Sequence, residues 1–290
     1  MGEMRTVNIL IIAEKSDQTA IYFSNYLSSR SVDHKVLTWT SVFKNINLAC
    51  KTLKSIECLF SGIYIREPSL VDIRQCSFIE AIYCTIFDHG NVIMPSPFST
   101  NWAKHLHDLK LNIALANHKG SNVYTPDTFS GFNMPVHFEF EIIKPISSMR
   151  GHTQKRVYNS NYQFEPLNSD PIPFLLQKEV SGKEIRAHVI DGDIVAVIVH
   201  HAMHDYKFKE NGNFYCEDYF MDTRTKRVLL DLAAFERSRF CGIDIIIDDQ
   251  GSTWVLEVNP MPGFHTFDSA RQDSLHPISD LLYKILSKTG

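Results

Sequence analysis

The segment from Gly242 to Phe264 restricts the fold more than any other part of the chain. Two apolar runs, residues 242–247 and 254–258, are separated by the polar stretch Asp-Asp-Gln-Gly at 248–251. Apolar runs of this length around a short turn sequence that ends in Gly are typical of paired antiparallel strands. The sequence therefore predicts a β-hairpin at this position.

Three side chains with oxygen atoms lie on this apolar hairpin, namely Asp244 on the first strand and Glu257 and Asn259 on the second. Because alternate residues of a strand face the same side, Glu257 and Asn259 point one way, and the hairpin can bring Asp244 beside them. Oxygen donors without His or Cys suit Mg²⁺ rather than zinc, and phosphate oxygens usually complete such a site. The segment predicts a nucleotide-using enzyme; the alternative is a solvated strand face.

Composition narrows the classes of function. The 29 basic and 33 acidic residues give a net charge of −4, so no basic field points to nucleic acid as a partner. The six cysteines form no CxxC pair, which is typical of reduced thiols. No apolar stretch approaches the ~18 residues of a membrane-spanning helix. We expect a cytoplasmic protein that binds neither nucleic acid nor membrane.

Periodicity divides the chain into three regions. Residues 1–95 alternate β-rich runs with helical stretches, which predicts an α/β domain with a parallel sheet. Residues 96–172 begin at a Pro-Ser-Pro break and include a helix over about 101–117. The predicted apolar face of that helix carries Leu106, Leu109, Ile113 and Ala116. Residues 173–290 begin as a meander of strands and end in an amphipathic helix.

Five short motifs follow one another along the last two regions: Ile143-Lys144-Pro145, Leu176-Gln177-Lys178-Glu179-Val180, Glu184-Ile185-Arg186, Gly242-Ile243-Asp244 and Leu256-Glu257-Val258-Asn259-Pro260. Their order resembles the ATP-grasp superfamily, and within it the RimK-type carboxylate–amine ligases and glutathione synthetase-like enzymes. The resemblance covers roughly residues 95–290. It implies an α/β (α+β) ATP-grasp fold, in which an N-terminal parallel α/β domain precedes two α+β subdomains that clasp ATP.

The resemblance assigns two lysines to the ATP phosphates, whose negative charge requires cations aimed at them. Lys144, at a strand end before a Pro, looks like the family's phosphate-binding lysine. Lys110 matches the other ATP-contacting lysine; the alternative for Lys110 is a solvated helix residue. The loop 147–153 stands where the family has a phosphate-covering loop, but it contains one glycine where RimK-type loops often contain several.

The stretch Gln177, Lys178, Glu179 and Val180 resembles the hinge that binds adenine through backbone groups. By analogy, the Lys178 carbonyl and the Val180 N–H would contact the purine. Glu184 matches the carboxylate that accepts hydrogen bonds from the ribose. Without the resemblance, this stretch would be interpreted as a surface hairpin.

The implied reaction forms an amide. ATP phosphorylates a substrate carboxylate, an amine attacks the acyl phosphate, and ADP and phosphate are released. Lys144 and Arg186 would offset the developing charge, and Asp244, Glu257 and Asn259 would hold Mg²⁺, with Mn²⁺ as an alternative. The substrates would be a small-molecule or peptide carboxylate and an amine, and the resemblance allows a homodimer.

Substrate contacts are predicted from two further segments. The loop with Gly263 and Phe264 follows the metal strand and should face the acceptor, as a similar loop does in D-alanine–D-alanine ligase. His200, His201 and His204 follow a strand that should reach the same site, so that one of them could contact a substrate. Ile65-Arg66-Glu67-Pro68 is similar to a segment of ATP-grasp ligases that modify ribosomal peptides.

Two other functions remain open from the sequence. An inositol-phosphate kinase of the same fold shares the Gly-Ile-Asp run and a Pro-Gly-aromatic loop, but it needs a strongly basic acceptor site. Beyond Arg224, Lys226 and Arg227, the chain has no dense basic cluster. A non-catalytic nucleotide-binding protein would usually have lost metal or phosphate ligands, and those residues are present here.

Overall fold

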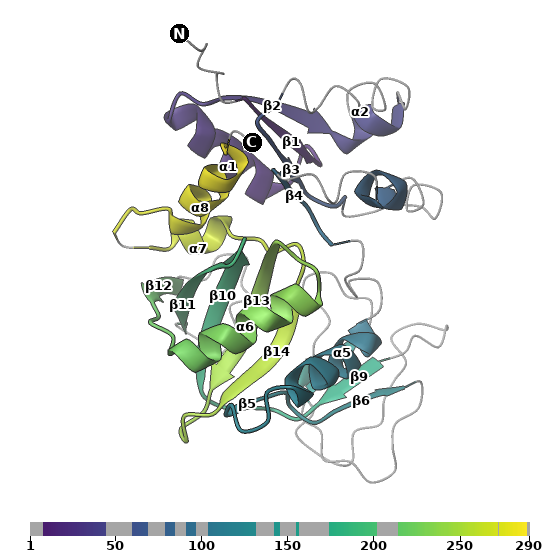
Figure 1. The fold of residues 1–290 in the computed structure, drawn as a ribbon, viewed down its shortest axis with the longest axis vertical. Coiled ribbons are helices and arrows are strands. Elements are labelled where there is room, and N and C mark those ends of the chain that lie inside the picture. Colours follow the sequence, from purple (N-terminus) through teal and green to yellow (C-terminus); the bar gives the residue numbers. More distant parts are fainter. Residues whose placement is uncertain are drawn as a thin grey trace.

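The structure, a computed structural model, describes residues 8–44, 60–68, 79–84, 91–96, 104–131, 142–145, 155–156, 174–201, 214–271 and 273–288. Three sheets with flanking helices form the fold over these ranges, as predicted for an α/β (α+β) chain (Figure 1). None of the helices in the described ranges has the length and apolar character needed to cross a membrane.

The N-terminal sheet is parallel and has the strand order β2-β1-β3-β4. Its elements are β1 (Asn8–Ala13), α1 (Gln18–Ser29), β2 (Asp33–Thr38), α2 (Trp39–Lys44), β3 (Gly62–Ile65) and β4 (Val92–Ile93). Helix α1 begins after Asp17, whose carboxylate accepts a hydrogen bond from the Ala20 N–H at 2.9 Å. The parallel α/β domain predicted from the alternating runs is therefore present.

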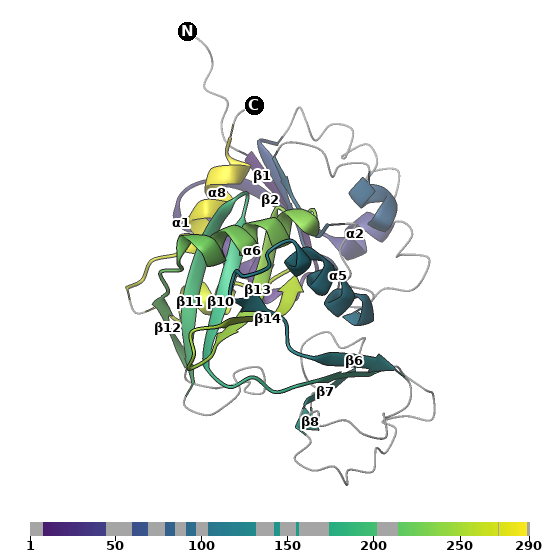
Figure 2. The same cartoon turned by 60° about the horizontal axis from the view of Figure 1, so that its bottom comes forward.

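The second sheet is antiparallel and has the order β6-β9-β7-β8. Its strands are β6 (Thr128–Gly131), β7 (Ile142–Pro145), β8 (Lys155–Arg156) and β9 (Phe174–Gln177). Strands β6, β7 and β8 stand apart from the larger sheet (Figure 2). Strand β9 begins just after residue 173 but belongs to this sheet. The predicted boundary at residue 173 therefore does not separate this sheet from the six-stranded sheet described next.

The third sheet has six strands in the order β12-β11-β10-β13-β14-β5. They are β5 (Val123–Tyr124), β10 (Lys183–Ile190), β11 (Asp193–His201), β12 (Phe214–Asp218), β13 (Phe240–Ile247) and β14 (Thr253–Asn259). The turn between β10 and β11 has positive φ at Asp191 and Gly192, 49° and 90°, as its Asp-Gly sequence requires. The predicted β13–β14 hairpin is also formed.

Helix α6 (Thr223–Phe235) covers one face of this sheet (Figure 1). Ile185, Ala187 and Val189 of β10 share a buried cluster with Val228 and Leu229 of α6. Since side chains alternate along a strand, the residues between them lie on the opposite face. We call that opposite face the polar face, because it carries Glu184, Arg186, His188, Asp244, Glu257 and Asn259.

Helix α5 (Lys104–Ala116) packs against α6, and its buried residues differ from the predicted ones. Leu111, Ala114 and Leu115 are buried, whereas Ile113 is 51% exposed and Ala116 is exposed. The predicted burial was therefore wrong for Ile113 and Ala116. The side chains of Leu106 and Leu109 are not among those that the structure describes. The helix has two sets of apolar residues at helical spacing. Its packing against α6 buries the set with Leu111, Ala114 and Leu115 and leaves Ile113 exposed.

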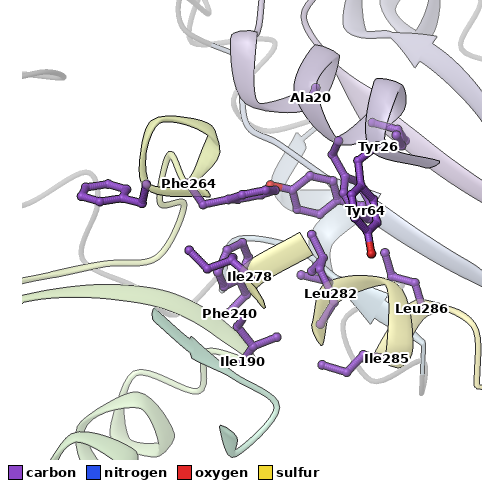
Figure 3. Packing of buried hydrophobic residues seen from close by; sticks show 14 of the residues in the cluster. Ala20, Tyr26, Tyr64, Ile190, Phe240, Phe264, Ile278, Leu282, Ile285 and Leu286 are labelled. Carbon is purple, nitrogen blue, oxygen red and sulfur yellow. The ribbon is translucent and has the colours of Figure 1, made fainter. Parts of the chain in front are cut away.

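The C-terminal helices pack on the N-terminal sheet. Helix α8 (Pro277–Leu286) approaches β3 so closely that a Cβ on Gly62 would collide with the Leu286 backbone. Leu282 and Leu286 share one buried cluster with Tyr64 and with Phe264, which precedes α7 (His265–Ser269) (Figure 3). The N-terminal domain and the C-terminal region are therefore joined by a common apolar core.

Candidate active site

Strand register gathers the predicted metal ligands on the polar face. Arg186 of β10 lies opposite Asp244 of β13, and Asp244 lies opposite Glu257 of β14. In the neighbouring row, His188, Gly242 and Asn259 are aligned in the same way. Directly opposed residues of antiparallel strands share a face, so the register places the three oxygen-bearing side chains in neighbouring rows of one face.

A β-bulge at Leu256 aims Glu257 at its neighbours. Asp244 pairs with Glu257, but the next residue of β13, Ile245, pairs with Val255, so Leu256 has no partner in the ladder. This extra residue lets both Val255 and Val258 pack in the cluster under α6 while Glu257 faces Asp244. Without the bulge, strand alternation could not bury both valines on one side of the sheet.

Arg186 and Asp244 form a buried ion pair. The Arg186 Nη1 donates to Asp244 Oδ1 at 2.5 Å, and the side chains are 6% and 12% exposed. A charge-assisted contact offsets the desolvation of two buried charges, and it fixes the orientation of the guanidinium. The Arg186 Cζ also lies 5.6 Å from the centre of the Phe267 ring. The guanidinium is thus held from two sides beside the predicted metal ligands.

Gly242 provides the space that Arg186 occupies. A Cβ at this position would overlap the Arg186 guanidinium and the Pro262 side chain. Any larger residue must therefore displace both the guanidinium and the Pro262 side chain. This contact explains the glycine of the Gly-Ile-Asp motif, whose function the sequence alone did not show.

The oxygen donors fit a hard cation that takes the rest of its ligands from a substrate. Asn259 Oδ1 accepts a hydrogen bond from the Met261 N–H at 2.9 Å, which orients the amide. Within the described ranges, no group of three or more His, Cys, Asp or Glu side chains is arranged as a metal centre. Two carboxylates and one amide are the kinds of ligand that Mg²⁺ takes when phosphate oxygens complete its coordination.

The predicted adenine hinge connects two sheets. It begins at Gln177, the last residue of β9, whose Nε2 lies 3.3 Å from Thr128 Oγ1, and it leads into β10. The Lys178 N–H donates to the Asp127 carbonyl at 2.9 Å, while Glu179 and Val180 are partly buried. Glu184 then lies on the polar face, two residues before Arg186.

The two predicted phosphate-binding lysines have different positions. The backbone of Lys144 lies in β7 opposite Leu175, and its side chain is outside the described residues, as is the loop 147–153. Lys110 lies on α5, and its Nζ is 3.3 Å from Glu236 Oε2. Because α5 packs on the α6 side of the sheet, the structure places Lys110 away from the polar face, which does not support the predicted contact with ATP.

Two predicted substrate contacts are corrected by the structure. His200 stacks on Tyr215, with ring centres 4.5 Å apart, and belongs to the α6 side because it lies two residues after Ile198. Phe264 is 0% exposed and packs against Phe23 and Tyr64 in the interdomain core. The aromatic ring that was expected to face a substrate instead docks the two domains together.

The other two predicted substrate contacts are not contradicted. Gly263 follows the predicted metal strand, and a Cβ there would meet Thr19 Oγ1 at an ordinary contact distance of 3.6 Å. The side chain of His201, and all of His204, lie outside the described residues. These positions stay predictions.

His188 is a residue of the polar face that the sequence did not single out. Its side chain is 0% exposed, and its ring centre lies 5.2 Å from that of Phe267. Burial, together with the nearby Arg186 charge, holds the pKa of His188 well below its usual range. A neutral imidazole therefore fills the space beside Arg186 without adding charge to the site.

Arg66, in the Ile-Arg-Glu-Pro segment, joins the N-terminal domain to the loop that follows Asn259. Its Nε contacts Asp17 Oδ2 at 2.7 Å, and its Nη1 donates to the Pro262 carbonyl at 3.0 Å. The neighbouring Glu67 N–H points at Met261 Sδ at 2.7 Å. Since Arg66 is 6% exposed, these contacts are shielded from water, and they fix the loop beside the predicted metal ligands.

We expect Arg66→Met to loosen this loop, because the Pro262 carbonyl and Asp17 both lose their cationic partner. Amide hydrogen exchange in residues 260–265 should rise, because the loop loses a buried contact that links it to the N-terminal domain. Arg66→Lys should give part of this effect, since one ammonium cannot replace the separate Nε and Nη1 contacts.

Arg30→Met is the matched control for Arg66→Met. Arg30 pairs with Asp280 at 2.7 Å across the same two domains, but both side chains are exposed, 48% and 42%. Exposed pairs contribute little, so hydrogen exchange in the loop should stay at the wild-type rate. Equal exchange in the Arg66 and Arg30 variants would show that Arg66 does not position the loop.

Comparison with known sequences finds similarity over part of the chain. Residues 167–275 match the RimK-like ATP-grasp domain. N-acetylaspartylglutamate synthase A of Mus musculus is 28% identical over 170 residues, which cover 52% of this chain and 44% of that protein. The chain thus aligns with less than half the length of this curated relative.

Two solved structures share the arrangement of elements. The ATP-grasp ligase PsnB, complexed with a phosphomimetic variant of its minimal precursor, Mg and ADP, has a TM-score of 0.65 at 15% identity and covers 97% of this chain and 99% of that one. D-alanine–D-alanine ligase from Bacillus anthracis complexed with ATP has a TM-score of 0.62 at 16% identity, covering 97% and 96%. Because the sequence identities are this low, the structural similarity shows a shared fold alone.

Proposed function

We propose that the chain is an ATP-dependent carboxylate–amine ligase, in keeping with its ATP-grasp fold and with the RimK-like ATP-grasp model that matches residues 167–275. In this reaction the γ-phosphoryl group of ATP passes to a carboxylate oxygen, an amine displaces phosphate from the acyl phosphate, and an amide forms. The observation that carries the proposal is the row of Arg186, Asp244 and Glu257 with Asn259 beside it.

The proposed metal ligands are Asp244, Glu257 and Asn259. They would hold Mg²⁺, which neutralises phosphate charge when bound. Arg186 presents a planar guanidinium that its contacts with Asp244 and Phe267 hold in place. A fixed cationic donor stabilises charge that develops on transferring or acyl oxygens without reorganising during the reaction. Its proposed role is to bind the reacting oxygens.

The proposed nucleotide contacts lie where two sheets meet. Residues 177–180 would bind adenine, Glu184 would bind the ribose, and Lys144 would contact phosphate. The support is the position of the hinge between β9 and β10, because it leads into Glu184 and Arg186 of β10, and Arg186 lies opposite the predicted metal ligand Asp244 of β13. Lys110 is left out, because it pairs with Glu236 on the other side of the sheet.

Charge on the polar face favours a ligase over an inositol-phosphate kinase. A polyphosphate acceptor requires several cations, whereas the described residues of this face include Arg186 together with Glu184, Asp244 and Glu257. Arg186 is itself paired with Asp244. A carboxylate acceptor carries less negative charge than a polyphosphate, so it fits a face with few cationic and several acidic side chains better. We propose a small-molecule or peptide carboxylate and an amine as substrates.

The proposal is tested by incubating the protein with ATP, Mg²⁺ and pools of amino acids and acidic peptides. We expect ADP release that depends on the pool and a new product whose mass equals two substrates minus one water. A product that instead gains a phosphoryl group would identify a kinase. Nucleotide binding without ADP release in any pool would support a non-catalytic binding protein.

A further inference from the structure

A cavity of about 580 Å³ lies between the end of α5 and helix α6. Helix α6 covers one face of the six-stranded sheet (Figure 1), and α5 packs beside it, so the sheet separates the cavity between these helices from the polar face. Its volume falls in the range of small-molecule sites, roughly 300–1,000 Å³. The residues that line it include His118, Lys119, Arg224, Arg227, Asp231 and Phe235.

The cavity gathers positive charge in a chain whose net charge is −4. Arg224 donates to the Gly120 carbonyl, and His118 Nε2 lies 3.3 Å from Asp231 Oδ2. Lys119 and Arg227 line the same cavity, and no hydrogen bond or ion pair joins either of them to the rest of the described chain. Among the lysine and arginine side chains that line the cavity, Lys119 and Arg227 therefore have no acidic partner in the described ranges to offset their charge.

The cavity also has apolar walls. Ala114 and Val228 are 6% and 1% exposed and form part of its lining. Phe235, at the end of α6, is 43% exposed and lines it as well. Cationic groups beside exposed apolar surface match a ligand that has an anionic group and an apolar part.

We propose that this cavity binds a small organic anion. A carboxylate or phosphate group would contact Lys119 and Arg227, and the apolar part of the ligand would lie against Phe235 and Val228. The planar guanidinium of Arg227 matches the paired oxygens of either group. Nothing in this assignment depends on the ligase reaction, because the sheet lies between the cavity and the polar face.

The test uses phenyl phosphate, which has both parts, in calorimetric titration of the full chain saturated with ADP and Mg²⁺. Saturating nucleotide directs the probe away from the proposed ATP site. We expect one phenyl phosphate per chain, weaker binding of inorganic phosphate, and no saturable binding of benzyl alcohol, which lacks the charge. Replacing phenyl phosphate by benzoate distinguishes a carboxylate from a phosphate preference.

Arg227→Glu should weaken phenyl phosphate binding at least about tenfold, which corresponds to about 1.4 kcal/mol. Lys226→Glu is the matched control, because Lys226 is exposed on the same helix turn and does not line the cavity. It makes the same change in net charge and should leave binding within about twofold. Circular dichroism checks that both variants are folded.

Three results would overturn the site. One is the absence of saturable binding of either phenyl phosphate or benzoate at millimolar concentration. Another is an equal loss in the Arg227 and Lys226 variants, which would show general attraction to positive charge. The third is binding that occurs only without nucleotide, which would place the probe in the ATP site. An inactive protein that still binds the probe would reject the ligase proposal alone.

Discussion

Glu257→Gln is expected to lower ADP formation at least about a hundredfold while the chain stays folded. Glu257 ends the row formed with Arg186 and Asp244, and it is partly exposed, so an amide of nearly the same shape can take the place of the carboxylate. The substitution removes one of the two carboxylates proposed to hold Mg²⁺. The Mg²⁺ concentration required for half-maximal rate should rise along with the loss of rate.

Asp249→Asn is the control for this variant, because Asp249 is an exposed acid in the turn of the same hairpin, away from the row. Its rate and Mg²⁺ requirement should match those of the wild type. Asp244→Asn is a less specific test, since it also removes the partner of buried Arg186, and breaking such a pair typically costs about 3–5 kcal/mol. Wild-type turnover of Glu257→Gln would reject the metal assignment.

Gly242→Ala is expected to have the second large effect. The added methyl group overlaps the Arg186 guanidinium and Pro262, so Arg186 must leave its position between Asp244 and Phe267. We expect kcat to fall about a hundredfold, with nucleotide affinity nearly unchanged, since removal of one oriented donor typically has an effect of that size. Overpacking should also lower the free energy of unfolding by about 1–3 kcal/mol, which urea titration measures.

A double-mutant cycle with Arg186→Ala separates this effect from general damage to the sheet. If Gly242 acts by making room for Arg186, adding Gly242→Ala to Arg186→Ala should lower kcat no further. Additive losses would mean that the methyl group disturbs the site by another route, such as the loop at Pro262. The cycle therefore tests the physical explanation of the Gly-Ile-Asp motif.

Local sequence patterns were sufficient for the elements of the site. The strand period placed Glu257 and Asn259 on one side, and the Asp-Asp-Gln-Gly turn brought Asp244 to them, as the register confirms. These features depend on neighbours within a few residues along the chain.

Features set by contacts between distant segments could not be predicted in the same way. The side on which His200 lies depends on how β11 pairs with β10 and β12, and the burial of Phe264 depends on the docking of the N-terminal domain. The contact between Arg66 and Pro262 joins residues that are 196 positions apart. No local pattern in the sequence predicts such contacts, so the positions of these residues could be learned only from the structure.

The transfer of oxygen from the substrate carboxylate to phosphate tests the proposed reaction most directly. The carboxylate substrate found in the mass screen is labelled with ¹⁸O in its carboxyl group, and the inorganic phosphate that is released with ADP is analysed by mass spectrometry. An acyl phosphate intermediate predicts that one ¹⁸O atom appears in that phosphate. Release of unlabelled phosphate, or a phosphoryl group retained on a product hydroxyl, would contradict a carboxylate–amine ligase.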